Sequence, residues 1–163
     1  MPNVTLLCGK IASGKTHYAE KMYRSKGVCV LSSDELLLTL FDGCLADKHV
    51  ETESRALLFL CKQAKSLYDL GNNVIIDCGF WYQKQRNEAR TFFQTNHISY
   101  RFLFFDTDDK LRRARLEERN KTLAKATERV FLIEEETLFR LDRKFEGFEQ
   151  TETDILIFNE DSW

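Results

Sequence analysis

The stretch Gly9-Lys10-Ile11-Ala12-Ser13-Gly14-Lys15-Thr16 matches the pattern G-x-x-x-x-G-K-[ST] at every specified position. That pattern describes the P-loop, a loop between a strand and a helix that cradles nucleotide phosphates. Residues 4–8 before it form a short apolar run, and apolar side chains recur at helical spacing after it. Because four specified positions match by chance in roughly one chain in a few hundred of this length, phosphate binding is favoured over a plain glycine-bearing turn.

The residue types of the loop explain how it would bind ATP. Gly9 and Gly14 allow backbone turns that exclude a Cβ atom, so that successive N–H groups can point at phosphate oxygens. Lys15 is expected to reach the β- and γ-phosphates as a point charge, and the Thr16 hydroxyl to coordinate a Mg²⁺ ion that arrives with the nucleotide. We expect all eight residues of the loop to contact the nucleotide.

The composition is that of one globular domain. With 163 residues, 43% of them hydrophobic, and a single proline at position 2, the chain shows no linker, so we expect one domain over residues 1–163. The net charge of −2 argues against a general nucleic-acid surface, although a local basic groove would survive that average. No apolar stretch reaches transmembrane length, and five cysteines without C-x-x-C spacing are typical of reduced thiols in a cytoplasmic protein.

Strand and helix patterns alternate along the chain. Apolar runs rich in β-formers follow the first strand at residues 28–31, 74–76, 99–105 and 154–158. The order β-α-β-α-α-β-α-β-α-α-β predicts an α/β fold with a five-stranded parallel sheet, helices on both faces in three layers, and right-handed crossovers. Ligands of such folds bind outside the carboxyl ends of the strands.

Two longer stretches have less regular patterns. Residues 42–54 are polar without clear periodicity, and they predict either a solvated loop or an excursion that covers an acceptor substrate. Residues 127–148 carry apolar side chains at workable helical spacing, which predicts further helix before the last strand.

Asp34 follows the second predicted strand at the expected ligand-binding edge. A carboxylate in this place is a candidate general base toward a hydroxyl acceptor, and we assign Asp34 both to catalysis and to substrate contact. The plainer alternative is that Ser33 or Asp34 caps the helix that follows. The two roles can coexist.

Asp77 ends the third predicted strand, whose continuous apolar run is typical of a central strand buried on both faces. A carboxylate beside a P-loop can hold the waters of Mg²⁺, which prefers hard oxygen ligands. We therefore predict that Asp77, with Thr16, belongs to the metal site and borders the substrate. A strand-end turn is the alternative.

Aromatic and basic residues follow Asp77. Phe80 and Trp81 could form a wall of the acceptor pocket or close the core beneath the next helix, and their pattern does not decide between these. We assign both as candidate substrate contacts. Arg86 and Arg90 share a helix face, and we assign Arg86 to an anionic group of the substrate because a guanidinium suits phosphate oxygens. For Arg90 a solvated basic face is preferred.

Arg112, Arg115 and Arg119 are spaced three and four residues apart, so they share one face of a predicted helix. They concentrate positive charge before a polar segment that could act as a lid. Phosphoryl transfer requires charge stabilisation at the γ-phosphate, and we assign this role to Arg119, with Arg115 as a further nucleotide contact. A surface face of Arg–Glu pairs is the alternative.

Four segments together resemble a known group of enzymes. They are the loop Gly9–Thr16, Ser33-Asp34-Glu35, Asp77-Cys78-Gly79-Phe80 and Arg115-Leu116-Glu117-Glu118-Arg119-Asn120. In this order they resemble the small P-loop kinases of the adenylate kinase-like and zeta toxin or chloramphenicol phosphotransferase-like group, and more closely the AAA_33-type bacterial ATP-binding proteins. The resemblance implies that Asp34 is the catalytic base, that Asp77 lies near Mg²⁺, and that Arg115 and Arg119 pack on adenine and contact phosphates. Cys78 and Trp81 break the Asp-Gly-Phe-Pro-Arg pattern of adenylate kinases, which argues against a nucleoside monophosphate acceptor.

The sequence thus predicts an ATP- and Mg²⁺-dependent kinase whose acceptor is a hydroxyl of a small molecule, such as a nucleotide sugar, an antibiotic or a nucleoside. One alternative is a polynucleotide 5′-hydroxyl kinase, which the acidic balance disfavours. The other is a nucleotide-dependent ATPase switch that recruits a protein partner. No N-K-x-D guanine signal follows Asn120-Lys121, which disfavours a GTPase switch.

Overall fold

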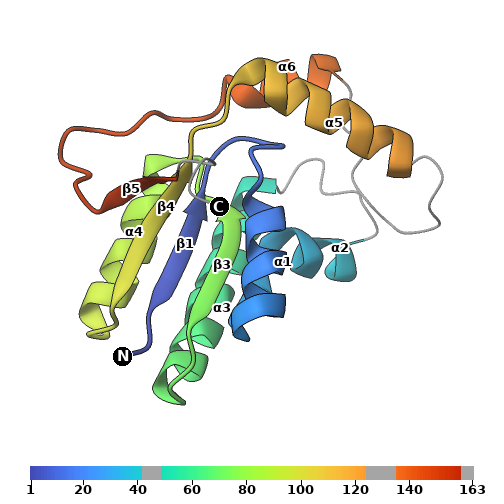
Figure 1. Cartoon of the computed structure of the whole chain (residues 1–163). Helices are drawn as coiled ribbons and strands as arrows, with labels where there is room; N and C mark the ends of the chain where they lie inside the picture. The colour runs from blue at the N-terminus through green and yellow to red at the C-terminus, as the bar shows by residue number, and fades with distance from the viewer. Residues whose placement is uncertain (42–48, 124–134, 159–163) are drawn as a thin grey trace.

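A parallel sheet runs through the computed structural model, which describes residues 1–41, 49–123 and 135–158 (Figure 1). Its order in the described part of the chain is β2-β3-β1-β4-β5, and all four neighbouring pairs are parallel. The strands are β1 (Val4–Cys8), β2 (Cys29–Ser32), β3 (Val74–Gly79), β4 (Tyr100–Phe105) and β5 (Ile155–Phe158). The predicted α/β fold is confirmed.

The helices lie on both faces of this sheet, because successive strand residues point to opposite sides. Leu6 packs in a cluster with side chains of α3 (His49–Asp69) and α4 (Gln83–Thr95). Leu7 packs in a second cluster with side chains of α1 (Lys15–Lys26). The remaining described helices are α2 (Ser33–Leu40), α5 (Asp109–Leu123) and α6 (Glu135–Asp142). Helix α5 crosses above the carboxyl ends of the strands (Figure 1).

The register of the sheet places the ends of four strands at one edge. Ser32, the last residue of β2, pairs with Asp77 of β3, and Cys8, the last residue of β1, pairs with Gly79 of β3 and Phe104 of β4. The P-loop follows β1 and Asp34 follows β2. Segments that are far apart in the sequence therefore meet at this edge, as the parallel arrangement predicts.

The described helix boundaries agree with the sequence in some places and differ in others. Helix α1 ends at Lys26 and is capped by Gly27, which has φ 61° and donates its N–H to the carbonyl of Tyr23, as the sequence predicted. The described part of the predicted helix 127–148 is helical only as α6, so the prediction was wrong for residues 143–148. Phe145 and Phe148 leave helical geometry and pack on Phe104, where ring centroids lie 5.9 and 4.6 Å apart. Residues 49–54 belong to α3, and residues 42–48 and 127–134 lie outside the described residues.

The buried thiols behave as small core side chains. Burial raises the pKa values of Cys8, Cys61 and Cys78 to about 12. These thiols therefore stay protonated at neutral pH, which removes the thiolate that reacts as a nucleophile.

Two arginines of α4 bind the segment that precedes β5, and this corrects a prediction. Arg86 is 0% exposed, and its Nε lies 2.7 Å from a Glu152 carboxylate oxygen. Arg90 binds Asp154 at 2.7 Å and Glu152 at 3.3 Å. Arg86 thus has a protein carboxylate as its anionic partner, and its assignment to the substrate was wrong. Arg90 is not on a solvated face either, since its side chain is only 13% exposed.

We predict that Glu152→Gln lowers the free energy of unfolding at pH 7 by about 3–5 kcal/mol, the usual cost of breaking a buried ion pair. Burial raises the pKa of Glu152, but hydrogen bonds and charges of Arg86 and Arg90 outweigh it and lower the pKa below its ordinary value. A lowered carboxyl pKa contributes stability above the unfolded-state pKa of about 4.3, and this contribution is lost as pH falls through the folded-state value.

Urea unfolding of both chains between pH 7 and acid pH measures this dependence. The stability of the Glu152→Gln chain should fall less steeply below about pH 4.3 than that of the parent. Lys84→Met, at a side chain 78% exposed on the same helix, is the control and should leave both quantities unchanged. Equal slopes in the parent and the Glu152→Gln chain would contradict the ion-pair explanation.

Candidate active site

The P-loop has the backbone conformation that its glycines predict. Gly14 has φ 98° at the N-terminus of α1, and Gly9 has φ 148°. A Cβ atom on Gly9 would lie 3.0 Å from the Ser13 hydroxyl oxygen and 3.1 Å from the carbonyl oxygen of Phe105. Only glycine fits this place without displacing the backbone of β4.

Four carbonyl groups of the loop accept hydrogen bonds from side chains. The Gly9 carbonyl accepts from the Trp81 indole at 3.1 Å and from Lys15 Nζ at 2.9 Å, and Lys15 Nζ also binds the Lys10 carbonyl at 2.6 Å. The Ile11 carbonyl accepts from Arg112 Nη1 at 3.0 Å, and the Ser13 carbonyl accepts from Thr107 Oγ1 at 2.9 Å.

These bonds fix the direction of the loop's N–H groups. The C=O and N–H groups of one trans peptide point in opposite directions, and the described chain has no cis peptide. Trp81, Arg112 and Thr107, which lie outside the loop, therefore turn the N–H groups of Lys10, Ala12 and Gly14 away from themselves. Consecutive N–H groups on one side form a concave site for an anion.

Lys15 lies folded over its own loop. Besides the two carbonyls, Nζ contacts the Ser13 hydroxyl at 3.3 Å. Burial lowers the pKa of Lys15, and the carboxylates of Asp77 and Asp34 partly offset this effect. The ammonium is therefore at the loop, where a phosphate oxygen can replace neutral oxygen partners.

Thr16 and Asp77 form a pair of hard oxygen donors beside the loop. The Thr16 hydroxyl donates to an Asp77 carboxylate oxygen at 2.8 Å, and Asp77 is 8% exposed. This donor chemistry fits Mg²⁺, which keeps several waters and takes few protein ligands when it arrives with a nucleotide. In the described residues no group of three or more His, Cys, Asp or Glu side chains could hold a metal by itself. Nucleotide oxygens would therefore complete the coordination.

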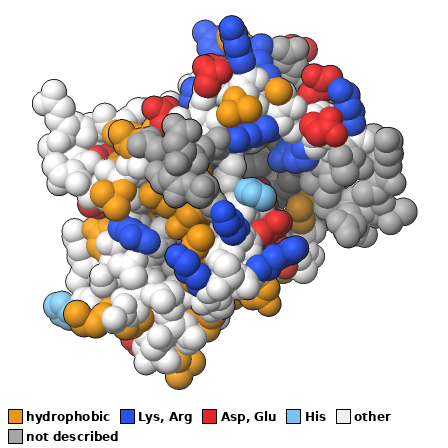
Figure 2. Space-filling view, viewed as in Figure 1, with side chains coloured by type: hydrophobic (Ala, Val, Ile, Leu, Met, Phe, Trp, Pro, Cys, Tyr) orange, Lys and Arg blue, Asp and Glu red, His pale blue; other side chains and the backbone are white. Residues whose placement is uncertain are grey.

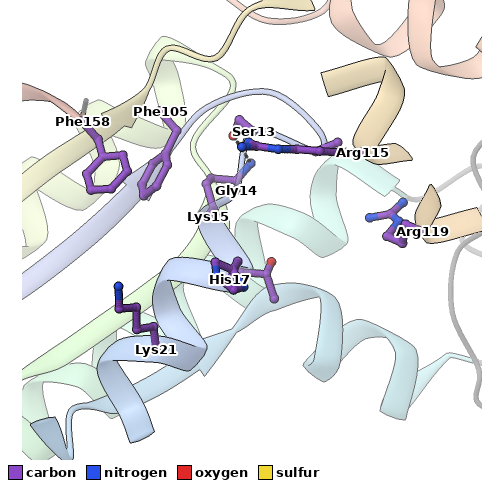
Figure 3. Close-up of a pocket in the computed structure, with 11 residues that line it drawn as sticks. Ser13, Gly14, Lys15, His17, Lys21, Phe105, Arg115, Arg119 and Phe158 are labelled. Atoms are coloured by element: carbon purple, nitrogen blue, oxygen red, sulfur yellow. Dashed lines mark hydrogen bonds between the residues drawn. The ribbon is translucent and has the colours of Figure 1, made fainter. Parts of the chain in front are cut away.

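A pocket of about 600 Å³ opens beside the loop (Figure 3). It is lined by Ala12, Ser13, Gly14, Lys15, Thr16, His17, Lys21, Phe105, Arg115, Arg119 and Phe158. In Figure 3, Arg115 and Arg119 come from α5 on one side of the loop, and Phe105 and Phe158 lie on the other. Figure 2 shows Lys and Arg side chains gathered on this face over α1 and α5. The pocket combines positive charge with an aromatic end.

Four of the lining residues were not predicted. Phe105 and Phe158 end neighbouring strands and stack with ring centroids 4.4 Å apart, and the Tyr18 ring packs edge-on against both. Their apolar runs predicted strands, but no pattern indicated which strand-end rings face a pocket. His17 and Lys21 lie four residues apart after the P-loop, and this spacing on the first turns of α1 was the available signal.

The three arginines predicted on one face of α5 differ in position, since two of them line the pocket and the third is buried. Arg115 and Arg119 line the pocket together with the P-loop, which agrees with their predicted position. Burial lowers the pKa of Arg119, and the charge of Asp34 partly offsets this. Arg112, by contrast, is 1% exposed and does not line the pocket.

Asp34 is exposed in the first turn of α2, and it is not the helix cap. Ser32 has that role, since its hydroxyl accepts the N–H of Glu35 at 3.2 Å. The charge of Asp34 acts on both Lys15 and Arg119, so the carboxylate lies on the same edge of the sheet as the phosphate site. Its role as a base stays a prediction.

Phe80 and Trp81 differ in position. Phe80 is 0% exposed and packs in the core against Phe102 with ring centroids 5.3 Å apart, so its assignment to a pocket wall was wrong. Trp81 is half-buried and supports the loop through Gly9, while its own carbonyl accepts the N–H of Glu146 at 2.9 Å. Contact of Trp81 with an acceptor stays a prediction.

Comparison with known proteins places the chain in a family. The family model AAA_33, described as an AAA domain, matches residues 4–144. The chain belongs to the AAA_33 family. A search of curated proteins finds no match. Within the described residues, no helix is both long and apolar enough to span a membrane.

Solved structures with the AAA_33 chain's fold include several kinases. An unliganded sugar kinase from Janibacter sp. HTCC2649 is 19% identical, with a TM-score of 0.63, and the match covers 97% of this chain and 84% of that one. APS kinase CysC of Mycobacterium tuberculosis, in complex with AMPPNP and APS, is 24% identical with a TM-score of 0.61, covering 77% and 73%. A chain of the Pnkp1/Rnl/Hen1 RNA repair complex is 18% identical with a TM-score of 0.66, covering 88% and 44%. At these identities the comparison shows a common fold.

We predict that Lys15→Met weakens binding of Mg²⁺-ATP by about tenfold or more, because a charge-assisted hydrogen bond contributes roughly 1.5–3 kcal/mol. Isothermal titration calorimetry on the parent and variant chains measures the effect. Lys26→Met, at an exposed lysine in the last turn of the same helix, is the control and should bind as the parent does. Equal affinity of the Lys15→Met chain and the parent would show that the loop does not hold nucleotide phosphates.

Proposed function

We propose that this AAA_33 protein is an ATP- and Mg²⁺-dependent kinase that transfers the γ-phosphoryl group to a hydroxyl of a small molecule. The observation that carries the proposal is the meeting at one sheet edge of the P-loop, the Thr16–Asp77 pair, the α5 arginines and Asp34. A binding module would need the loop alone. A phosphoryl transferase also needs a metal ligand, a cation for the transferred group and a base.

The residues of the site divide the work of the reaction. The loop N–H groups and Lys15 hold the phosphates, and Thr16 with Asp77 holds the metal. A bound Mg²⁺ would neutralise charge on the β- and γ-phosphate oxygens. Arg115 and Arg119 contribute positive charge beside the loop, where the γ-phosphoryl group carries negative charge as its bonds loosen.

Asp34 accepts the proton of the acceptor. The acceptor oxygen forms a bond to the γ-phosphorus while the bond between that phosphorus and the β–γ bridging oxygen breaks. ADP leaves with the bridging oxygen, and the hydroxyl proton passes to the Asp34 carboxylate. An exposed carboxylate at the entrance of the site can then release the proton to water.

A second candidate function is a polynucleotide 5′-hydroxyl kinase. The observation in its favour is the structural similarity to a chain of an RNA repair complex, of which this chain spans less than half. The chemistry at Asp34 would be the same, and only the acceptor would differ. A nucleotide-dependent switch with a protein partner is a further alternative, which predicts ATP hydrolysis that no acceptor accelerates.

The test is transfer of labelled γ-phosphate from ATP to a panel of acceptors by the purified protein with Mg²⁺. The panel holds sugars, nucleosides, nucleotide sugars, hydroxylated antibiotics and an oligonucleotide with a free 5′-hydroxyl. We expect one small-molecule class to accept the label. Labelling of the oligonucleotide alone would favour the second candidate, and turnover that no acceptor changes would favour the switch.

We predict that Asp34→Asn lowers the rate of transfer by about a hundredfold or more and leaves Mg²⁺-ATP affinity nearly unchanged, as expected when a general base is lost. Glu35→Gln, at the adjacent exposed carboxylate of the same helix turn, is the matched control and should keep the parent rate. A transfer rate in the Asp34→Asn chain equal to that of the parent would remove Asp34 from the mechanism.

A further inference from the structure

Arg112 uses its whole guanidinium in the protein interior beside the P-loop. A guanidinium has five N–H donors, and Arg112 makes five hydrogen bonds. Two go to Asp109 from Nε and Nη2 at 3.3 and 2.7 Å, two to Asp142 from Nη1 and Nη2 at 3.1 and 2.5 Å, and one from Nη1 to the Ile11 carbonyl at 3.0 Å. The residue is 1% exposed. Its side chain therefore has one fixed position.

The carbonyl that Arg112 binds belongs to a strained part of the loop. Ala12 has φ 58°, a left-handed conformation that costs a residue with a Cβ atom free energy. Such a conformation persists only where its surroundings hold it. The peptide before Ala12 is held, since Arg112 binds the Ile11 carbonyl, and one peptide further along Thr107 binds the Ser13 carbonyl.

The same guanidinium connects the loop to α6. Asp142 is the last residue of α6, and Asp109 lies in the first turn of α5. The carboxylates of Asp109 and Asp142 therefore both bind the Arg112 guanidinium, next to the loop that we propose binds phosphates. Without Arg112 both carboxylates would lose their buried cation, and their charge would repel the phosphates.

We propose that Arg112 is a positioning residue for nucleotide phosphate binding: it fixes the Ile11–Ala12 peptide so that the Ala12 N–H points into the phosphate site, and Asp142 makes this dependent on α6. The inference rests on the nucleotide binding of the proposed function. It does not require a particular acceptor. Arg112 does not line the pocket, so it acts through the loop and not by contact with the nucleotide.

A lysine cannot replace this arginine. Its ammonium has three donors on a single atom and no planar fork, so it cannot hold two carboxylates and a carbonyl in these directions. Arg112→Lys would keep the charge but lose the geometry. If charge alone mattered, the lysine would restore binding.

The experiment measures Mg²⁺-ATP affinity by calorimetry at a temperature well below the melting temperature of every chain compared. We expect Arg112→Met to raise Kd by about tenfold, and Arg112→Lys to restore only part of this. Asp142→Asn should give a smaller loss, because an amide oxygen still accepts one hydrogen bond. Arg113→Met, at the exposed neighbour on α5, is the control and should change Kd by less than about twofold, as most surface substitutions do.

A second pair of chains separates positioning from a purely structural role. Glycine adopts the left-handed conformation without cost. In an Ala12→Gly background, Arg112 should therefore contribute less to holding the loop in its binding conformation. The loss caused by Arg112→Met should then shrink to about threefold or less, which is the non-additivity expected of residues that act through each other. If Arg112 only stabilised the fold, Arg112→Met would lower the melting temperature. The Kd of the folded chain would then be unchanged both in the parent and in the Ala12→Gly background.

The outcomes distinguish this inference from the proposed function. If the parent and the Arg113→Met chain bind Mg²⁺-ATP while Arg112→Met binds equally well, Arg112 has no positioning role and the kinase proposal stands. The same holds if the Arg112→Met loss is equal in the parent and in the Ala12→Gly background. If the parent binds no nucleotide, the proposed function fails and this inference fails with it.

Discussion

The site depends on one constraint: the carbonyl groups of the P-loop must be held away from the phosphates. Side chains from three places outside the loop donate hydrogen bonds to these carbonyls. Trp81 follows β3, Thr107 precedes α5, and Arg112 lies on α5. Each is remote from residues 9–16 in sequence, so the loop motif supplies the conformational freedom and the rest of the fold selects the conformation. A P-loop sequence without these donors would have the same glycines but a less fixed set of N–H groups.

The sequence predicted the fold and the position of the P-loop because both depend on local patterns. Strand order along the chain, the P-loop and the pairing of Thr16 with Asp77 follow from motif and sheet geometry. Arg86 was misassigned because its partner, Glu152, lies 66 residues further along the chain. Nothing local distinguishes an arginine that meets a buried carboxylate from one that faces a ligand. Phe80 was misassigned for a similar reason, since an aromatic residue after a strand can turn inward or outward.

The arginines of this chain show how tertiary partners sort one residue type into different roles. Arg86 and Arg112 are almost wholly buried and bound to carboxylates, and they hold backbone segments together. Arg115 is one turn beyond Arg112 on the same helix, yet it lines the pocket. Helical spacing correctly placed these two residues on neighbouring positions of one face. Asp142, at the end of another helix, binds Arg112 and so gives that arginine a structural role, while Arg115 lines the pocket.

The conformation of Lys15 shows why loop geometry has a large share in nucleotide affinity. Its ammonium already contacts three neutral oxygens of the loop, so phosphate binding exchanges these contacts for new ones. The ammonium is charged in both states, so the gain would be the difference between its hydrogen bonds to neutral oxygens and those to a charged phosphate oxygen. The N–H groups, by contrast, gain most when their direction needs no rearrangement on binding, since ordering a loop costs conformational entropy. Residues that fix the loop before binding therefore increase nucleotide affinity without touching the nucleotide. They do so because the loop backbone loses less conformational entropy when the nucleotide binds.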